Sequence, residues 1–594
     1  MKLNNINIIE EYILIKIGSI GMLGLLIMGN KFLKDDILNS KISEIKEDIH
    51  EEEKYYFRRR ILKKFLKDKI LYNGTEYFFM IDGVIFNKIE LKDKYKKSTF
   101  EELIITLYKK KESFFDEFKG SFSGIFYDKI NEKIIIFTDQ IGTKKIYYYL
   151  GKDLLVGSNF YEVIDILKLN KIEYSLNLLA AYSLLTYGSM IENITLVNEV
   201  KFLKAGEYIK YENGNLEVIR YHKFTKEAIK EKNEEEIIKK IDKLFNQAIK
   251  LQIEKNKEYG YLNLAPLSAG LDSRMTNFVL KKYTKNEVIN ITYSQNNYRD
   301  EEVPKKISVD LKNHWIFKSL NNGLSLKLLE KVSNITYGTT DSYGAAQVLD
   351  MVRYLNFDKI GIIHTGMLGE VLAGAELEYQ ELELSSSYLK DKLIKLKKGQ
   401  KFESFDCFEI YNYYNGSFLK NFMGSPKVFQ EVSESFSPFY DVDFLQYIVN
   451  IPPELRKNYY IYDKWVLKKY PEAAKYLHNG RKIGGKNLKI GKRIITVNEL
   501  LPRTKEYFKR KIKSYTSQLE TNNHMNPLDY WYNNNKDLQN YFDSLLRELI
   551  EEINFSELKS DCQTLYINGN TKEKDLVLTL LIAYKKIFKN ERIK

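Results

Sequence analysis

The sequence predicts an α+β sandwich at the N-terminus, an α/β domain with a parallel sheet after it, and a helical extension at the C-terminus. In the first 220 residues, turn residues separate short apolar strands, a pattern typical of antiparallel sheet. After about residue 226, apolar strands alternate with helical patterns, which favours a parallel sheet. The last stretch lacks strand patterns. We therefore expect three domains, spanning 1–225, 226–499 and 500–594.

The composition is that of an ordinary globular protein. Hydrophobic residues make up 44% of the 594-residue chain and charged residues 29%, which excludes a mainly disordered protein. Cys407 and Cys562 are the only cysteines. Two cysteines are too few for a disulfide scaffold or for a Cys-rich zinc or iron–sulfur site.

The most apolar stretch, residues 12–28, is interrupted by Lys16 and is shorter than the roughly 20 residues that a membrane span needs. Glu10 precedes it, whereas a signal peptide would carry a basic segment there. We interpret the stretch as a buried strand pair that turns at Gly18 or Gly21. The sequence thus predicts a cytoplasmic protein that binds no membrane.

Positive charge is concentrated late in the chain. Residues 479–515 hold twelve Lys or Arg against two Glu, within a chain of net charge +13. Such a run is typical of a solvated basic face, of a site for an anion such as a nucleotide phosphate, or of a nucleic-acid surface. No nucleic-acid motif accompanies it, so we expect no nucleic-acid partner.

Two kinds of pattern set the expected elements. Before residue 225 we expect apolar strands, a hairpin that turns at Asn213–Gly214, and some helix around 36–68. The strands lie within 77–91, 121–150 and 200–221. After residue 225 we expect an amphipathic helix over 234–253, followed by strand–helix units. Their strands span 261–267, 287–293 and 359–365, and their helices start at Ser273, Glu301 and Gly369.

The segment Tyr261–Arg274 is the most informative one for function. A strand ends in Ser268-Ala269-Gly270-Leu271-Asp272-Ser273, and a helix follows. Small residues let the backbone approach a phosphate, and the helix N-terminus offers N–H donors and a positive dipole end. Asp272 would then hold a divalent cation that bridges phosphates. An ordinary strand–turn–helix junction, capped by Asp or Ser, is the alternative interpretation.

Ser-x-Gly-x-Asp-Ser after a strand resembles the pyrophosphate loop of the ATP pyrophosphatase superfamily. Further motifs, in matching order between about residues 70 and 490, resemble asparagine synthetase and its relatives, the β-lactam synthetases and lasso-peptide cyclases. These motifs are Met80–Asn87, Gly120–Asp128, Asp139–Tyr148, Gly206–Tyr208, Thr365–Glu370 with Gly374, and Ser437–Asp441. The resemblance implies an Ntn-hydrolase-like sandwich of the glutamine amidotransferase type, then an α/β ATP pyrophosphatase domain (adenine nucleotide α-hydrolase-like), then the helical extension.

In that family the second domain adenylates a carboxylate with ATP, and an amine then attacks the acyl-adenylate. The resemblance therefore implies ATP and Mg²⁺ as cofactors, with Asp272 and Glu370 as metal ligands and Lys482 and Glu370 as catalytic residues. Arg481 or Lys486 could take the place of Lys482. The implied ATP-binding residues are Leu267, Ser268, Gly270, Asp272, Ser273 and Gly366.

Several positions depart from the family pattern. Position 2 is Lys, and no cysteine occurs in the first 400 residues, so we expect a degenerate first domain that does not hydrolyse glutamine. Ala269 replaces a glycine, which would strain the loop if that residue needs a positive φ. Met367 replaces the residue that handles the proton of the nucleophile, and a thioether cannot act as a base. Candidate replacements are His364, Tyr343 and Glu376.

The resemblance thus predicts an AMP-forming amide ligase whose partners are a small-molecule or peptide carboxylate and an amine. Aspartate is the default acid, as in asparagine biosynthesis, and the amine is ammonia or a substrate amine. Two alternatives stay open: a tailoring enzyme that acts on a peptide or natural-product intermediate, and a catalytically degenerate nucleotide-binding scaffold. The sequence does not determine the oligomeric state, and a homodimer stays open.

Overall fold

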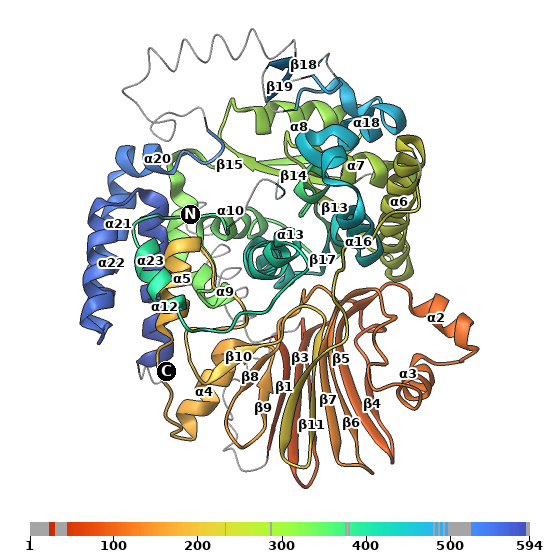
Figure 1. The fold of residues 1–594 in the computed structure, drawn as a ribbon, viewed down its shortest axis with the longest axis vertical. Helices are drawn as coiled ribbons and strands as arrows, with labels where there is room; N and C mark the ends of the chain where they lie inside the picture. The colour runs from red at the N-terminus through yellow and green to blue at the C-terminus, as the bar shows by residue number, and fades with distance from the viewer. Residues whose placement is uncertain are drawn as a thin grey trace, which may run out of the picture.

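The structure is a computed structural model in which two stacked sheets lie below a parallel sheet and a group of C-terminal helices (Figure 1). The described residues are 23–29, 44–231, 233–284, 288–374, 377, 381–478, 482–484, 487–490, 493–496 and 524–589. No helix among these residues is long and apolar enough to cross a membrane.

Two six-stranded sheets, with orders β10-β8-β9-β1-β3-β2 and β12-β11-β7-β6-β5-β4, form the N-terminal sandwich. Alternate residues of each strand point to opposite faces, as strand geometry requires. In β1, Leu25 and Ile27 belong to the core between the sheets, whereas Leu26 and Met28 belong to the core on the outer face. The strands are β1 Gly24–Gly29, β2 Ile45–Glu51, β3 Tyr55–Leu62, β4 Leu71–Asn73, β5 Tyr77–Ile85, β6 Gly120–Asp128, β7 Lys133–Thr138, β8 Tyr147–Tyr149, β9 Leu155–Gly157, β10 Val200–Phe202, β11 Glu207–Glu212 and β12 Asn215–Arg220.

Helices cover both outer faces of the sandwich. Phe100 and Leu103, in the region of α2 (Lys88–Tyr95) and α3 (Phe100–Tyr108), pack on the β5–β6 face. On the other side, α4 (Phe160–Leu169) and α5 (Leu178–Tyr187) pack on the β1 sheet. The resulting α-β-β-α layering is that of an Ntn-hydrolase-like domain.

The expected hairpin is confirmed. β11 pairs with β12, and Glu212 lies opposite Asn215. Asn213 and Gly214 have φ of 52° and 80°, the left-handed geometry of a type I′ turn.

The expected helix around 36–68 is wrong over its described part, because 45–51 and 55–62 are strands β2 and β3. Arg59 of β3 is buried in the sheet, where it donates to Asp48 and to three backbone carbonyl oxygens. Of the strand pair expected over residues 12–28, the described residues include only 23–28. One strand, β1, begins there and spans Gly24–Gly29, and the other expected strand lies outside the described residues.

A five-stranded parallel sheet follows, with strand order β15-β14-β13-β16-β17. Successive residues of its strands again face opposite sides of the sheet. Ala265 lies in the core with α6, α7, α16 and α18, and Leu264 lies in the core with α9, α10 and α15. The strands are β13 Leu262–Pro266, β14 Ile289–Ser294, β15 His314–Ser319, β16 Ile360–His364 and β17 Ser435–Phe436. The helices are α6 Glu234–Tyr259, α7 Leu271–Tyr283, α8 Arg299–Asp310, α9 Leu329–Thr336, α10 Tyr343–Val352, α11 Glu370–Ala373, α15 Ser425–Gln430, α16 Val442–Asn450 and α18 Tyr460–Lys469.

The C-terminal helices pack against the sandwich, at the left of Figure 1. Tyr182 of α5 donates to Asp561 at 2.6 Å, and Tyr174 donates to the carbonyl oxygen of Ile587 at 2.6 Å. Their apolar side chains share one core with α4, α5 and the outer face of β1. The helices are α20 Leu528–Asn534, α21 Lys536–Leu549, α22 Ser556–Asn568 and α23 Thr571–Phe588.

Candidate functional site

The parallel sheet has its topological switch point between β13 and β16. From β13 the sheet extends through β14 to β15 on one side, and β16 lies on the other side. In open α/β sheets, the loops that leave the strands at such a point diverge and form a binding crevice. Here these loops are 267–270 and 365–369, and most of the site residues expected from the sequence lie in them or at the start of the helix that follows each one.

Side chains of the first loop hold it in a tight turn. The N–H of Ser268 donates to Ser273 Oγ at 3.0 Å, and the two serine hydroxyls lie 2.9 Å apart. The N–H of Gly270 donates to Ser268 Oγ at 3.2 Å, and that of Ala269 donates to Asp300 at 2.8 Å. Ala269 is not among the residues with positive φ, so the loop does not need glycine there.

The loop leads directly into α7, whose N-cap is Gly270. No side chain caps this helix. The first N–H groups of a helix have no acceptor within it, and the helix dipole adds partial positive charge at the same end. The N-terminus of α7 is therefore suited to an anion such as a phosphate group.

Two glycines let the second loop lie against the start of α7. A methyl group on Gly366 would come within 2.4 Å of the Ser273 amide nitrogen, and one on Gly369 would lie 2.1 Å from Asp272 Cγ. Neither glycine has a positive φ. Close approach, rather than backbone conformation, is what requires glycine at both positions.

Asp272 and Glu370 place two carboxylates in the crevice. Burial, reinforced by the charge of Glu370, raises the pKa of Asp272 to about 7, and burial also raises the pKa of Glu370. Tyr462 of α18 donates from its hydroxyl to Asp272 Oδ1 at 2.9 Å. Nearby carboxylates that disfavour each other's charge are suited to sharing a cation.

These two residues fit a magnesium ion that takes further ligands from phosphates and water, as Mg²⁺ usually does. A site made by the protein alone is not supported, because the described residues contain no group of three or more His, Cys, Asp or Glu that could hold a metal.

Leu267 continues β13 into the crevice. Its N–H donates to the carbonyl oxygen of Ile291 at 2.9 Å, and its own carbonyl oxygen accepts from the Thr292 hydroxyl at 2.8 Å. The Leu267 side chain is buried. The two loops therefore bring together Leu267, Ser268, Gly270, Asp272, Ser273, Gly366 and Glu370.

Arg274 joins the first loop to the chain that precedes Lys482. Its guanidinium is fully buried and donates to the carbonyl oxygen of Ala269 at 2.8 Å. It also donates to three carbonyl oxygens in the segment 473–477, at 2.9 to 3.2 Å.

Lys482 itself is exposed and forms no hydrogen bond or ion pair within the described residues. The structure thus does not bring Lys482 into contact with Asp272 or Glu370. The alternatives Arg481 and Lys486, and most of the basic run 479–515, lie outside the described residues.

His364 is not placed to act as a base. It is fully buried below the crevice, where its ring nitrogens lie 2.8 Å from Gln252 Oε1 and 3.0 Å from Asn263 Oδ1. Burial lowers its pKa to about 3. Tyr343 packs near Lys572 of α23, and Glu376 lies outside the described residues.

The second loop is strained at Leu368. This buried residue has a φ of 64°, a left-handed conformation that costs a non-glycine residue of order 1–3 kcal/mol. Such strain often occurs at functional sites, and here it lies between Met367 and Gly369.

A polar cavity of about 300 Å³ adjoins Glu370. Tyr187 and Ser189 line it from the sandwich, and residues of 412–421 line it from the α/β domain. Residues 413–417 form a π-helix, a rare conformation that is frequent at functional sites. Asn415 Nδ2 is buried and has no hydrogen-bond partner within the described residues. The volume lies at the lower end of the range for small-molecule sites.

Residues 68–222 match the family described as "Glutamine amidotransferase domain". The chain contains a glutamine amidotransferase-type domain. The match covers about a quarter of the chain and spans β4 to β12 with α2 to α5. Both cysteines lie outside it: Cys562 is buried in α22, and Cys407 precedes the helix Phe408–Asn412.

No curated protein matches the chain. Among solved structures, the "allosteric regulatory enzyme of purine biosynthesis" is 9% identical, with 52% of this chain and 77% of that chain covered and a TM-score of 0.23. The glutamine phosphoribosylpyrophosphate amidotransferase from B. subtilis, complexed with ADP and GMP, is 11% identical, with 68% and 92% covered and a TM-score of 0.22. Both TM-scores are too low to show a shared overall fold.

Three contributors to the site were not expected from the sequence. Asp300 caps the Ala269 N–H, Tyr462 binds Asp272, and Gly369 makes room for the Asp272 carboxylate. Gly369 lay within a recognised motif. Asp300 and Tyr462 are brought in by tertiary packing, and no local pattern marks them.

Proposed function

We propose that the protein is an ATP-dependent, AMP-forming amide ligase of the asparagine synthetase type. The observation that carries this proposal is the pairing of Asp272 with Glu370 beside an uncapped helix N-terminus at the switch point of a parallel sheet. In this proposal, Ser268, Gly270 and Ser273 contact the ATP phosphates, and Leu267 and Gly366 lie against the nucleoside.

In the reaction, a carboxylate oxygen of the acid attacks the α-phosphorus of ATP, and pyrophosphate leaves. An amine then attacks the acyl carbon, loses a proton and displaces AMP. Bound Mg²⁺, held by Asp272 and Glu370, would neutralise charge on the phosphates. The N–H groups of α7 add fixed positive dipoles at the same place. Tyr462 orients Asp272, and the close packing at Gly366 and Gly369 holds the second loop against the start of α7.

The polar cavity next to Glu370 is our proposed site for the carboxylate, the amine or both. Lys420 and Asn415 offer donors to a carboxylate, whereas Glu370 and Glu383 offer acceptors to an amine. A cavity of about 300 Å³ is far larger than ammonia needs, which supports a substrate of several non-hydrogen atoms. Aspartate is the default acid, and a peptide or natural-product intermediate remains the alternative.

The amine is not expected to come from glutamine. Hydrolysis by an amidotransferase-type domain needs a nucleophile, and residues 68–222 contain no cysteine. We predict that the purified protein releases no glutamate from glutamine, whether or not ATP is present. A coupled glutamate assay checks this, and steady release above the buffer rate would contradict it.

Isotope exchange between pyrophosphate and ATP tests the ligase proposal, with a panel of candidate acids and Mg²⁺ supplied. We expect exchange that depends on one acid and is absent from Asp272→Asn. Titration calorimetry with Mg²⁺–ATP provides a second readout. Tight nucleotide binding without exchange for any acid would favour a degenerate nucleotide-binding scaffold, which the substitutions at Ala269, Met367 and Glu370 also favour. Absence of both binding and exchange would refute both interpretations.

A further inference from the structure

Lys145 is a buried lysine at the junction between the sandwich and the α/β domain. Its side chain is 8% exposed, and within the described residues it forms no hydrogen bond and no ion pair. Its Nζ lies 5.3 Å from the centroid of the Phe202 ring. A cation in this position lacks the counter-charge that buried charges normally require.

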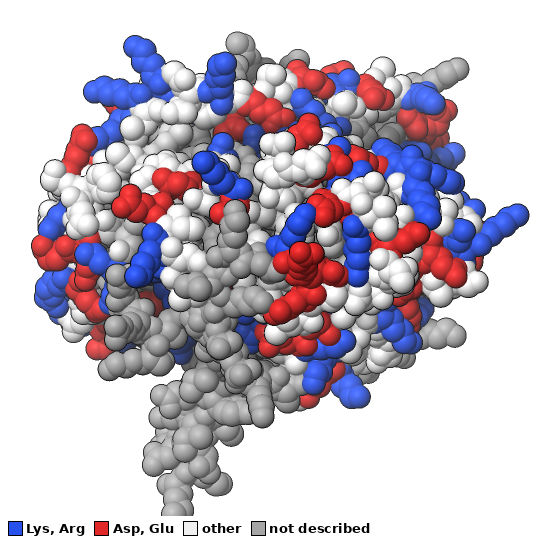
Figure 2. Space-filling view, turned by 90° about the horizontal axis from the view of Figure 1, so that it is seen from below, with Lys and Arg blue, Asp and Glu red and all other residues white. Residues whose placement is uncertain are grey.

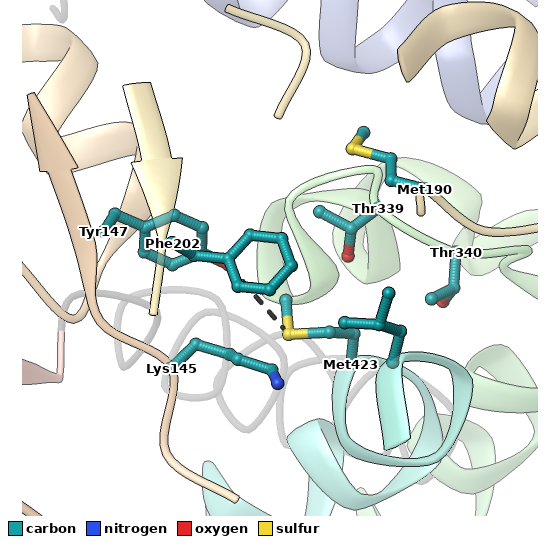
Figure 3. A pocket seen from close by; sticks show the side chains of 8 residues that line it. Lys145, Tyr147, Met190, Phe202, Thr339, Thr340 and Met423 are labelled. Atoms are coloured by element: carbon teal, nitrogen blue, oxygen red, sulfur yellow. Dashed lines mark hydrogen bonds between the residues drawn. The ribbon is translucent and has the colours of Figure 1, made fainter. Parts of the chain in front are cut away.

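The Lys145 amine points into a small apolar cavity. Figure 3 shows the amine next to the Met423 side chain, below the ring of Phe202 in this view. The cavity measures about 10 Å³, roughly the room of one water molecule. Thr339, Thr340 and Tyr147 each contribute a hydroxyl group to its lining. The remaining lining residues are Met190, Phe202, Leu419 and Met423.

A second cavity, of about 40 Å³, is also lined by Lys145. Its charged lining consists of the four lysines Lys69, Lys144, Lys145 and Lys427 and the three acids Asp82, Glu431 and Glu434. If all seven are ionised, the lining carries one excess positive charge.

The other three lysines have carboxylate partners. Lys144 and Lys69 both lie 3.2 to 3.4 Å from Asp82 and Glu434. Lys427 lies 4.0 Å from Glu431. These distances exceed the 2.7–2.9 Å that is usual for a tight charged pair. The cluster is therefore loosely packed around its cavity. Lys145 is the lysine of the four that has no carboxylate partner among these acids.

Neighbouring acids do not replace a direct partner for Lys145. Asp139 and Glu207 both favour the charged form of Lys145, but neither forms an ion pair with it. The Asp139 carboxylate accepts from Thr143 and from the N–H groups of Phe122 and Ile141, and the Glu207 carboxylate accepts from Arg220. Burial lowers the pKa of Lys145 to about 8. The ammonium form therefore still predominates at neutral pH, where it needs a counter-ion.

We propose that a small monovalent anion binds beside Lys145 Nζ and balances the charge of the junction between the two domains. The cavity sizes limit the anion to about one to four non-hydrogen atoms, as in a halide, nitrate, formate or bicarbonate. Bound there, the anion stabilises the folded state, because it has no comparable site in the unfolded chain. This site is separate from the crevice at Asp272 and does not depend on the proposed ligase activity.

Thermal unfolding at constant ionic strength tests the proposal, with potassium gluconate replaced stepwise by chloride, nitrate or formate. Gluconate is too large for either cavity. We expect the melting temperature of the wild type to rise by about 2 °C or more as the small anion saturates the site. Lys145→Met should show no such rise, and in gluconate it should melt above the wild type. Exposed Lys152 provides the control variant Lys152→Met, which should respond as the wild type does.

Crystals of the unmodified protein in bromide give a result that is independent of any variant. We expect an anomalous peak within hydrogen-bond distance of Lys145 Nζ. Equal responses to small anions in the wild type and Lys145→Met, or bromide crystals without a peak beside Lys145, would overturn the proposal. If Lys145→Met does not fold, Lys145→Gln takes its place in the melting experiment.

Discussion

At the scale of single residues, the ionised carboxylate of Asp272 destabilises the unliganded protein, although the same carboxylate is central to the proposed reaction. Its folded-state pKa of about 7 lies above its usual value of 3.8, because burial and Glu370 disfavour the carboxylate. Between these pH values the folded state binds more protons than the unfolded state. The stability contributed by this group is therefore greatest at low pH and falls as the pH rises to about 7.

We predict that Asp272→Asn has a more favourable effect on the free energy of unfolding at pH 8 than at pH 4, by about 1–3 kcal/mol, in the unliganded protein. Calorimetric unfolding at several pH values measures this difference. The same variant should bind Mg²⁺–ATP at least ten times more weakly than the wild type, because the metal loses a charged ligand. Unchanged nucleotide affinity would refute the role assigned to Asp272.

Gly369 offers a second test at this scale. We predict that Gly369→Ala lowers stability by about 1–3 kcal/mol and weakens nucleotide binding, because its methyl group would lie 2.1 Å from Asp272 Cγ. Gly344→Ala is the matched control, since its methyl group would meet its nearest neighbour at an ordinary 3.7 Å. Denaturant titration and calorimetry provide the readouts. If the two variants had equal stability and equal nucleotide affinity, the close approach of the second loop to Asp272 would not be needed for either property.

At the scale of elements, α7 is held in place by Arg274. Its buried guanidinium connects the loop before the helix with the segment 473–477. We predict that Arg274→Met costs about 2–4 kcal/mol, because several carbonyl oxygens lose their donor. Lys281→Met, on the same helix, should have little effect. Urea unfolding distinguishes the two, and a cost for Arg274→Met no larger than the control's would contradict this account.

Strand and helix patterns were predictable where packing follows local periodicity. The helix expected over 234–253 is α6, Glu234–Tyr259, and its apolar positions Ile237, Ile241 and Leu244 face the core. The strands at 261–267, 287–293 and 359–365 are β13, β14 and β16. β15 was not expected, because it is an edge strand whose residues are only partly buried.

The same reasoning failed where ion pairs replace apolar contacts. Arg58, Arg59 and Arg60 lie in β3, and their partners come from β2 and from elsewhere in the sandwich. A strand buried through long-range pairing carries no periodic apolar signal, so the sequence pattern could not reveal it.

At the scale of the whole molecule, the C-terminal helices complete the sandwich. Leu576 and Leu580 of α23 share a core with Leu26 and Met28 of β1 through the helices α4 and α5. The sandwich therefore has an apolar outer face that another part of the chain covers, at the left of Figure 1.

We predict that residues 1–225 expressed alone are insoluble or aggregate, since this face would be exposed to water. Coexpression with residues 524–594 as a separate chain should restore a soluble complex, detectable by size-exclusion chromatography. A control segment with Leu576→Asp and Leu580→Asp should not. A stable monomer of residues 1–225 alone would show that the helices are dispensable.

The distribution of surface charge does not indicate which molecules the protein binds. On the face that Figure 2 shows, Lys and Arg are intermingled with Asp and Glu. The concentration of basic residues in the sequence falls largely on residues outside those described. The expectation that the protein binds no nucleic acid therefore stays a prediction.

The sequence alone determined the alternation of strands and helices, the hairpin at Asn213–Gly214 and the phosphate-loop pattern from Ser268 to Ser273. Each of these depends on neighbours in the chain, through backbone conformation and side-chain periodicity. Only the tertiary structure decided that Asp272 lies near the charge of Glu370 and accepts from Tyr462, that His364 is buried below the crevice, and that Lys145 forms no ion pair within the described residues. Charge and burial at these residues come from groups that are distant in the chain, and no local pattern records such distances.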